Sequence, residues 1–202
     1  MALTMKKEFL VFWLIVATML VSCSKNIEPI EPEEKTIQEI ITAHADQVIT
    51  ALQARNMKKI SMLSHPAKGV RFSPYAFVQD KDLLFTPDQL INLLKDPKKY
   101  HWGEQDGSGN PLEMTFEKYY GDFVYDQDYA HAEKKSFNER IGKGNTIDNS
   151  QDYYSGGMVV EYHFSGFNPE YAGMDWRSLR LVFQKENSQW YLVGIIHDEW
   201  TI

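Results

Sequence analysis

The chain has 202 residues, of which 43% are hydrophobic, and this is enough for one ordinary domain with a buried core. Its formal net charge is −7, so we expect no nucleic acid partner and no attraction to anionic headgroups through the overall field. Only one cysteine is present, which excludes a disulfide within the chain.

The first 22 residues have the layout of a secretory leader. Lys6 and Lys7 precede an uncharged run from Phe9 to Val21. This run is too short to span a bilayer, which takes about 20 apolar residues. We therefore expect 1–22 to be a signal peptide that is removed, which leaves a still more acidic mature chain.

The end of the leader, Leu20-Val21-Ser22-Cys23, resembles the lipobox of bacterial lipoprotein precursors. The resemblance implies cleavage before Cys23 and attachment of fatty acyl chains, palmitate among them, to this residue. The alternative is a buried structural thiol. However, residues 24–34 read SKNIEPIEPEE, which is the composition of a disordered tether. Several acyl chains anchor a protein stably. We expect 23–34 to hold the protein on a membrane of the bacterial cell envelope, facing outside the cytoplasm.

The remaining residues, 35–202, are predicted to form a single domain. Apolar residues spaced by three and four predict an amphipathic helix over 35–56, and a second, short helix is expected over 57–63. The run 69–78 is β-branched and aromatic. Pro74 within this run predicts an edge strand or a strand broken at a bulge.

The middle of the chain alternates helix and strand signals. Thr86-Pro87-Asp88-Gln89 combines a helix cap, a proline at the first helical position and a capping-box glutamine, so we expect a helix over 87–95. A short strand over 100–105, a Gly-rich loop over 106–111 and a helix over 116–124 follow.

The C-terminal part contains the clearest strands. Residues 125–154 are polar and show little periodicity, but alternation predicts strands over 158–164, 176–184 and 189–200. The last two are expected to form a long antiparallel hairpin. Helices first and antiparallel strands last predict an α+β fold, with the N-terminal helices packed on a curved, cone-like antiparallel sheet.

This order of elements, finishing in WYLVGIIHDEWTI, resembles the nuclear transport factor 2-like fold, which ketosteroid isomerase, scytalone dehydratase and SnoaL-type cyclases share. The stretches GVRFSPYAF, GNTIDN and GMDWRSLRLVF are also similar to those of uncharacterised envelope lipoproteins. The resemblance covers about 36–202 and implies a cone that can hold a pocket. Members of the fold include enzymes, ligand binders and interaction modules. No stretch matches the setting of the isomerase's catalytic acids.

Three titratable side chains form a candidate catalytic set. Glu161 and His163 share one face of their strand, and His197 shares a face of the last strand with Val193 and Ile195. If all three point into the concave face, a carboxylate and two imidazoles converge and can transfer protons near neutral pH. The alternative is a solvent-facing row on an antiparallel sheet.

A candidate binding set lies on the neighbouring strand. Arg177 or Arg180 could hold an anionic group, with Trp176 beside them. Aromatic residues make up 13% of the chain and could form a sugar-stacking surface or simply fill a curved sheet.

We expect no metal and no cofactor. His197-Asp198-Glu199 cannot supply three ligands, because neighbours on a strand point to opposite faces. The loop 106–111, followed by Glu117, has oxygen-bearing side chains at the spacing of an EF-hand loop, but Pro111 stands where that family has glycine. A plain turn is the stronger interpretation.

Three functions remain open. The first is a non-enzymatic, lipid-anchored envelope protein that binds a small molecule or an envelope protein partner. The second is an acid–base enzyme of the isomerase, dehydratase or hydrolase type. The third is a filled cone that acts only through contacts of exposed aromatics such as Tyr153 and Tyr154.

Overall fold

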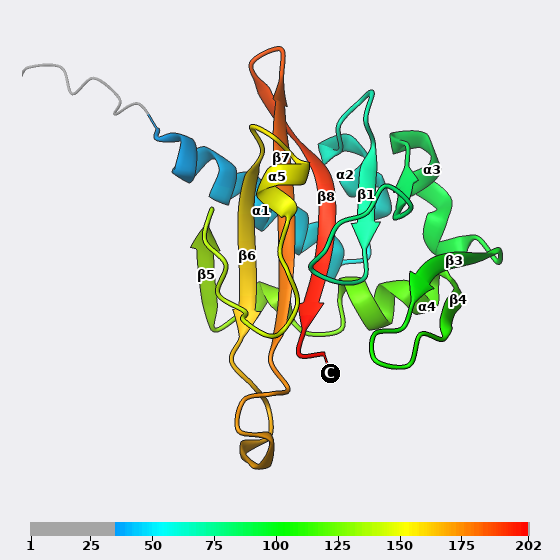
Figure 1. Ribbon diagram of the computed structural model, residues 1–202. Coiled ribbons are helices and arrows are strands. Elements are labelled where there is room, and N and C mark those ends of the chain that lie inside the picture. The colour runs from blue at the N-terminus through cyan, green and yellow to red at the C-terminus, as the bar shows by residue number, and fades with distance from the viewer. Residues whose placement is uncertain (1–34, 202) are drawn as a thin grey trace, which may run out of the picture. The chain divides into compact units, whose positions relative to one another are not determined.

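A six-stranded sheet forms the centre of the computed structural model, which describes residues 35–201 (Figure 1). The predicted leader, Cys23 and the tether lie outside the described residues. The strand order is β2-β1-β8-β7-β6-β5, and all neighbours are antiparallel except β1 and β8. The strands are β1 (Val70–Ser73), β2 (Leu83–Phe85), β5 (Lys134–Phe137), β6 (Met158–Phe164), β7 (Arg177–Glu186) and β8 (Gln189–Glu199).

Helices and a separate two-stranded ribbon surround this sheet. The ribbon consists of β3 (Lys99–Glu104) and β4 (Pro111–Thr115). The α-helices are α1 (Ile37–Gln53), α2 (Met57–Leu63), α3 (Pro87–Asn92), α4 (Phe116–Tyr119) and α5 (Ser150–Tyr153); the short 3-10 helices are Leu93–Lys95, Tyr129–His131 and Pro169–Tyr171, and Tyr120–Val124 continues α4 as a π-helix. The α+β prediction is therefore confirmed. None of the helices in the described part of the chain is long and apolar enough to cross a membrane.

The longest helix, α1, starts at a complete capping box. The Thr36 hydroxyl accepts from the Glu39 amide (3.2 Å), and the Glu39 carboxylate accepts from the Thr36 amide (2.8 Å). Its buried residues Ile41, Val48 and Leu52 lie one helical turn or two apart. The helix runs across one face of the sheet (Figure 1), which we call the helix-covered face.

The two faces of the sheet carry different clusters. On the helix-covered face, Val160, Tyr162, Leu179 and Leu181 join the large core that includes α1. The other face, which we call the outer face, has a smaller apolar cluster containing Val159, Val182, Val193, Ile196 and Tyr154. The segment 138–154, with α5, lies over the outer face (Figure 1).

A bulge in β8 changes which residues share a face. Val182 pairs with Gly194 but Phe183 pairs with Leu192, so Val193 is an extra residue in the ladder. Val193 consequently joins the outer face, whereas Ile195 joins the core. The prediction that Val193 and Ile195 share a face was wrong because one inserted residue reverses the alternation.

Two further strand details differ from expectation. β1 ends at Ser73, directly before Pro74, and it lies between β2 and β8 rather than at an edge. Proline has no backbone N–H to donate to a neighbouring strand, so β1 ends before Pro74. The Pro74 carbonyl faces the ring of His197 instead.

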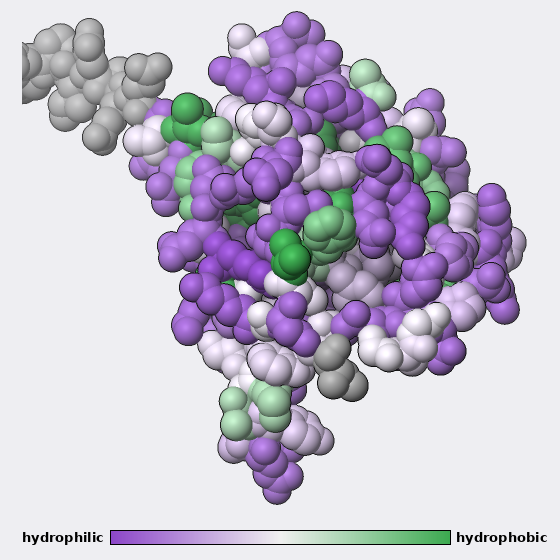
Figure 2. All heavy atoms as spheres, in the orientation of Figure 1, coloured by the Kyte–Doolittle hydropathy of each residue, from purple (hydrophilic) through white to green (hydrophobic). Residues whose placement is uncertain are grey.

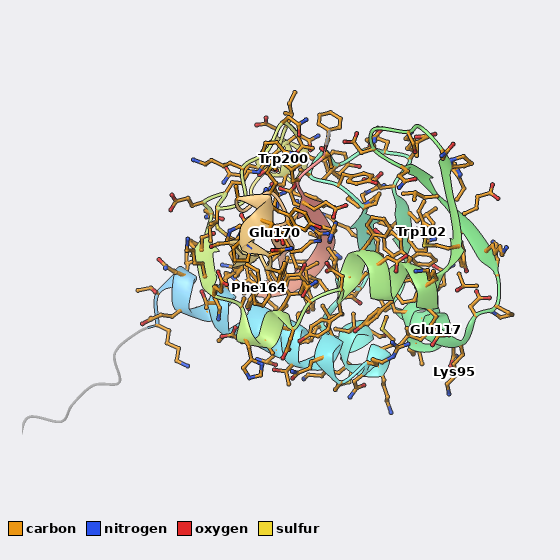
Figure 3. The ribbon with its side chains drawn as sticks, turned by 90° about the horizontal axis from the view of Figure 1, so that it is seen from below. Lys95, Trp102, Glu117, Phe164, Glu170 and Trp200 are labelled. Atoms are coloured by element: carbon orange, nitrogen blue, oxygen red, sulfur yellow. The ribbon has the colours of Figure 1, made fainter. Side chains whose placement is uncertain are left out.

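Aromatic rings fill the space between the ribbon and the sheet. The Trp102 ring stacks on the Tyr119 ring, with centroids 3.7 Å apart and planes at 11°. The Phe123 ring also stacks on Tyr119, with centroids 5.2 Å apart. Phe72 and Phe116 close the cluster with edge contacts. Figure 3 shows Trp102 between the ribbon and α4. The ring cluster occupies the space that a concave-face pocket would otherwise take.

Candidate functional site

The first predicted site residues, Glu161 and His163, lie on the outer face and are joined through Ser178. The Glu161 carboxylate accepts from the amides of Ile141 (2.9 Å) and Gly142 (2.8 Å) and from the Ser178 hydroxyl (2.5 Å). A hydroxyl has one hydrogen, so Ser178 accepts from Nδ1–H of His163 (2.8 Å). Burial lowers the pKa of His163, which favours its neutral form.

This arrangement differs from a nucleophilic triad. In a triad the histidine takes the serine proton and the carboxylate orients the histidine. Here the carboxylate of Glu161 takes the serine hydrogen bond, and His163 donates to the serine oxygen. Ser178 is therefore not activated as a nucleophile, and the three side chains bind the segment at Ile141 and Gly142 to the sheet.

Arg180 lies beside this group in a network of buried charges. It is only 1% exposed, and its guanidinium pairs with Asp148 and Asp198. Arg140 contacts the same Asp198 carboxylate at 2.8 Å. Burial raises the pKa of Asp198, and the two arginines act against that shift. The network leaves no open guanidinium at Arg180 for an anionic ligand.

Trp176 covers the network instead of lining an open site. Its ring is buried, lies 5.8 Å from that of His163, and packs on Gly142. A Cβ at Gly142 would lie 2.4 Å from the Trp176 ring and 2.8 Å from the Ser178 hydroxyl. The segment over the outer face can approach this closely only because residue 142 is glycine.

His197 lies on the opposite, helix-covered face, where it pairs with Leu179. Its Nδ1 is 3.2 Å from the Pro74 carbonyl and its Nε2 is 3.5 Å from the Asp126 carboxylate. The Pro74 carbonyl only accepts, so Nδ1 carries a hydrogen. Burial acts to lower the pKa of His197, but the adjacent Asp126 outweighs burial and raises it. His197 is thus buried between the Pro74 carbonyl and the Asp126 carboxylate, where its charged form is favoured relative to a histidine in water.

Arg177 belongs to the same cluster as His197. Its guanidinium lies 3.4 Å from Asp126 and 2.9 Å from Glu199. Burial acts to raise the pKa of Asp126, but His197, Tyr129 and Arg177 together hold it below its usual value. The prediction that the site residues converge was therefore wrong. The sheet lies between two groups of them: Glu161, His163, Arg180 and Trp176 on the outer face, and His197 and Arg177 on the helix-covered face.

A surface groove of about 560 Å³ is one of the open sites in the described part of the chain. Three loops form it: the one after β1, the turn between β3 and β4, and residues 145–147. Figure 2 shows this face, where a small hydrophobic area near the centre lies among hydrophilic residues. Its lining is Tyr75, Phe77, Gln79, Glu104, Gln105, Asp106, Gly107, Gly109, Asn145, Thr146, Ile147 and Thr201.

The loop after β1 is fixed from below by buried polar groups. The Arg71 guanidinium donates to the carbonyls of Gln79 (3.2 Å), Asp80 (2.9 Å) and Asp82. The Asp82 carboxylate accepts from the Ser73 hydroxyl and from the Gln79 amide (2.9 Å). Burial raises the pKa of Asp82, against the effect of these hydrogen bonds. These hydrogen bonds hold the loop against β1.

Two further contacts join this loop to its neighbours. The Tyr75 hydroxyl accepts from the Asp106 amide (3.1 Å), and the Asn149 side chain exchanges two hydrogen bonds with the backbone of Val78 (2.8 and 2.9 Å). All three walls of the groove are consequently tied together. Cross-links of this kind reduce the conformational entropy that the loops would lose on contact with another molecule.

The groove also contains polar groups without partners. The side-chain amide of Gln79, the Asp106 carboxylate and the Asn145 Nδ2 make no hydrogen bond to any other residue in the range 35–201, although the backbone amide of Gln79 donates to Asp82. Phe77 is 48% exposed at its rim. Phe77 lies in the stretch GVRFSPYAF and Asn145 in GNTIDN, but neither stretch contains a functional motif, and about 70 positions separate them.

Neither a metal site nor an EF-hand forms in the described region. Among residues 35–201, no group of three or more His, Cys, Asp or Glu side chains is placed to hold a metal ion. The loop 106–111 is the turn of the ribbon and follows a strand rather than a helix. Glu117 pairs with Arg55 at 3.0 Å, away from that turn.

Tyr153 and Tyr154 do not form the exposed contact surface that was considered. Tyr154 is buried and lies against Gly194, and the partly buried Tyr153 donates its hydroxyl hydrogen to Asp80 (2.8 Å). Both rings instead pack segment 138–154 onto the outer face.

Comparison with known proteins gives fold likenesses only. No family model and no curated protein matches the chain. Solved structures that resemble it include a calcium/calmodulin-dependent protein kinase II association domain from Xanthomonas campestris, with 13% identity, a TM-score of 0.36, and coverage of 83% of this chain and 90% of that one. Another, a variant whose name carries the label NTF2, has 15% identity, a TM-score of 0.32, and coverage of 79% and 98%.

At these scores the likenesses carry no argument about function. The name of the second structure contains the label NTF2, for nuclear transport factor 2. This is the fold whose order of elements the sequence resembles. The class of the protein follows from its own elements: it is an α+β domain in which helices pack on a largely antiparallel, curved sheet.

Proposed function

We propose that this protein is a lipid-anchored protein of the bacterial cell envelope whose α+β domain binds a ligand in the surface groove and performs no catalysis. The observation that carries the proposal is the groove itself. Its walls are cross-linked by Arg71, Tyr75 and Asn149, and it presents unpartnered polar groups to solvent. Binding sites are typically preformed hollows with a few convergent polar groups.

The anchor in this proposal is Cys23, on the strength of the lipobox-like sequence. Residues 24–34 then connect the lipid to the folded domain. Eleven residues span at most about 40 Å when fully extended. The groove would therefore act close to the membrane surface, on a small molecule or a segment of another envelope component.

Acid–base catalysis is the alternative that the predicted residues suggested, and their positions do not favour it. Glu161 is bonded to Ser178 and two amides beneath Trp176, while His197 is buried between the Pro74 carbonyl and the Asp126 carboxylate. A general base needs a free lone pair within reach of its substrate. Their contacts support a structural role for both groups.

Native mass spectrometry tests the binding proposal. The mature chain carrying Cys23→Ser is incubated with a small-molecule extract of bacterial envelopes, and its native and denatured masses are compared. A matched pair of variants locates the adduct: Phe77 is 48% exposed in the groove, and Phe167 is 49% exposed in the β6–β7 connection. We expect an adduct on the Cys23→Ser chain and on Phe167→Ala, but not on Phe77→Ala. Equal adducts on both variants would contradict binding in the groove.

The anchor has a separate test. Membrane fractions of cells expressing the full chain are compared with those expressing Cys23→Ser, and the mass of the N-terminal peptide is measured. We expect acyl chains on Cys23 and loss of membrane attachment in the variant. An unmodified, membrane-free wild-type protein would refute the anchor.

A further inference from the structure

We propose that the groove recognises a neutral carbohydrate, that is, a chain of uncharged sugar units. This inference rests on the proposed binding function and adds the chemical class of the ligand. Three features of the groove carry it: the charge of its lining, the placement of its aromatic rings, and the type of its unpartnered polar groups.

The lining disfavours an anionic ligand. None of the twelve lining residues is Lys, Arg or His, whereas two of them, Glu104 and Asp106, are acidic. The nearby Arg71 guanidinium is used on backbone carbonyls beneath the loop. An anion in the groove would meet the Asp106 carboxylate, and no cationic side chain in the lining would bind it directly.

The lining is also a poor match for a strongly cationic ligand. Glu104 is already neutralised by Lys81, whose Nζ lies 2.7 Å away. Of the two acidic lining residues, only Asp106 has no cationic partner among residues 35–201. A single exposed carboxylate contributes little to binding a polycation in water. The charge balance therefore favours an uncharged, polar ligand.

Aromatic rings at the groove provide faces for sugar rings. Phe77 is half exposed at the rim, and Tyr75 is fixed because its hydroxyl is engaged by the Asp106 amide. The C–H faces of a sugar ring are apolar and pack flat against aromatic rings, while its hydroxyls remain at the edge. An immobilised ring loses little conformational entropy on contact.

The unpartnered groups match the edge of such a ring. Gln79 and Asn145 each carry a planar amide with donors, and Asp106 carries a planar carboxylate with acceptors. Adjacent sugar hydroxyls both donate and accept, so they can satisfy these groups in pairs. The volume of about 560 Å³ lies within the range of about 300–1,000 Å³ that is usual for ligand sites.

A panel of oligosaccharides tests the inference. The mature chain with Cys23→Ser is measured by calorimetry against neutral hexasaccharides of glucose, mannose, galactose, xylose and N-acetylglucosamine in both linkage configurations. Hexagalacturonate serves as the anionic probe and the glucosamine hexamer as the cationic probe. We expect at least one neutral probe to bind with a Kd below about 1 mM, and neither charged probe to bind as tightly.

Variants connect the binding to the groove. Phe77→Ala is expected to weaken binding of the neutral probe about tenfold, in keeping with the loss of one stacking contact. Asn145→Ala is expected to weaken it similarly, and Phe167→Ala not at all. Circular dichroism spectra that match the parent chain show that each variant folds.

The outcomes separate this inference from the broader proposal. If no neutral oligosaccharide binds, or if a charged probe binds more tightly, the carbohydrate assignment is overturned. An envelope-extract adduct that is lost in Phe77→Ala and is not a sugar overturns the assignment but supports binding in the groove. If neither sugars nor extract bind in a Phe77-dependent way, both fail.

Discussion

Replacing Glu161 with alanine should strongly destabilise the fold. Its carboxylate accepts three hydrogen bonds, two from the amides of Ile141 and Gly142 and one from Ser178, in a site without solvent exposure. Alanine removes the acceptor and leaves all three donors buried. Glutamine is the informative intermediate, because its single carbonyl oxygen can keep the bonds to Gly142 and Ser178 that share one oxygen of Glu161.

The magnitude follows from the number of donors left unsatisfied. Each buried donor without a partner costs about 1–3 kcal/mol. Some of the three donors can relax toward water, so we expect Glu161→Ala to lower the free energy of unfolding by about 4 kcal/mol. Glu161→Gln loses the bond from the Ile141 amide and turns its own side-chain NH₂ toward that amide. We therefore expect it to lower the free energy of unfolding by about 2 kcal/mol.

Urea unfolding followed by tryptophan fluorescence measures both values. With a slope of about 2 kcal/mol per molar urea, Glu161→Ala should move the midpoint down by about 2 M. Glu170→Ala is the control, since Glu170 is exposed in the β6–β7 connection (Figure 3), and its effect should stay within about 0.5 kcal/mol. A loss below about 1 kcal/mol for Glu161→Ala would refute the structural role and return Glu161 to consideration as a catalytic acid.

Two more replacements test other parts of the structure. Because Asp126 raises the pKa of His197 above its ordinary value of 6.5, the stability that His197 adds over His197→Gln should be complete below pH 6.5 and lost as the pH rises through the folded-state pKa; a stability difference that does not change with pH would contradict the raised pKa of His197. Gly194→Ala should cost about 1–3 kcal/mol by thermal unfolding, since a Cβ there would lie 2.7 Å from the Tyr154 hydroxyl, whereas Gly121→Ala meets nothing within 4 Å and should be neutral or stabilising. Equal effects of the two glycine replacements would show that close packing at the bulge is not required.

Local signals in the sequence predicted most of the helices. The capping boxes at Thr36 and Thr86 each involve residues three positions apart, so a short window contains the whole interaction. The alternation of the last strands is equally local, and β6, β7 and β8 were predicted to within a few residues.

Features that depend on distant residues could not be predicted in this way. The bulge at Val193 is defined by its pairing with β7, and one extra residue reverses the faces of everything after it. Segment 125–154 is held by contacts such as Arg140 with Asp198, whose partner is 58 positions away. Its polar sequence has little periodicity because its side chains fill a buried network instead of a regular apolar face.

The groove was missed for the same reason. Phe77, Asp106 and Asn145 each lie in a different loop, and none has a motif around it. By contrast, Glu161 and His197 were predicted as site residues because histidine and glutamate side chains commonly transfer protons. In the structure, both side chains contact neighbouring residues in the loops around the sheet: Glu161 accepts from the Gly142 amide, and His197 lies beside Asp126.

Hydrogen–deuterium exchange tests most directly whether the groove is the binding site. The mature chain with Cys23→Ser is labelled with and without the bacterial envelope extract, and exchange is followed in peptides covering the three groove loops and β6. Protection by the extract confined to 74–82, 104–110 and 145–147 is the predicted result. Protection confined to β6 and β7, or no change at the groove loops, would contradict the groove as the functional site of this protein.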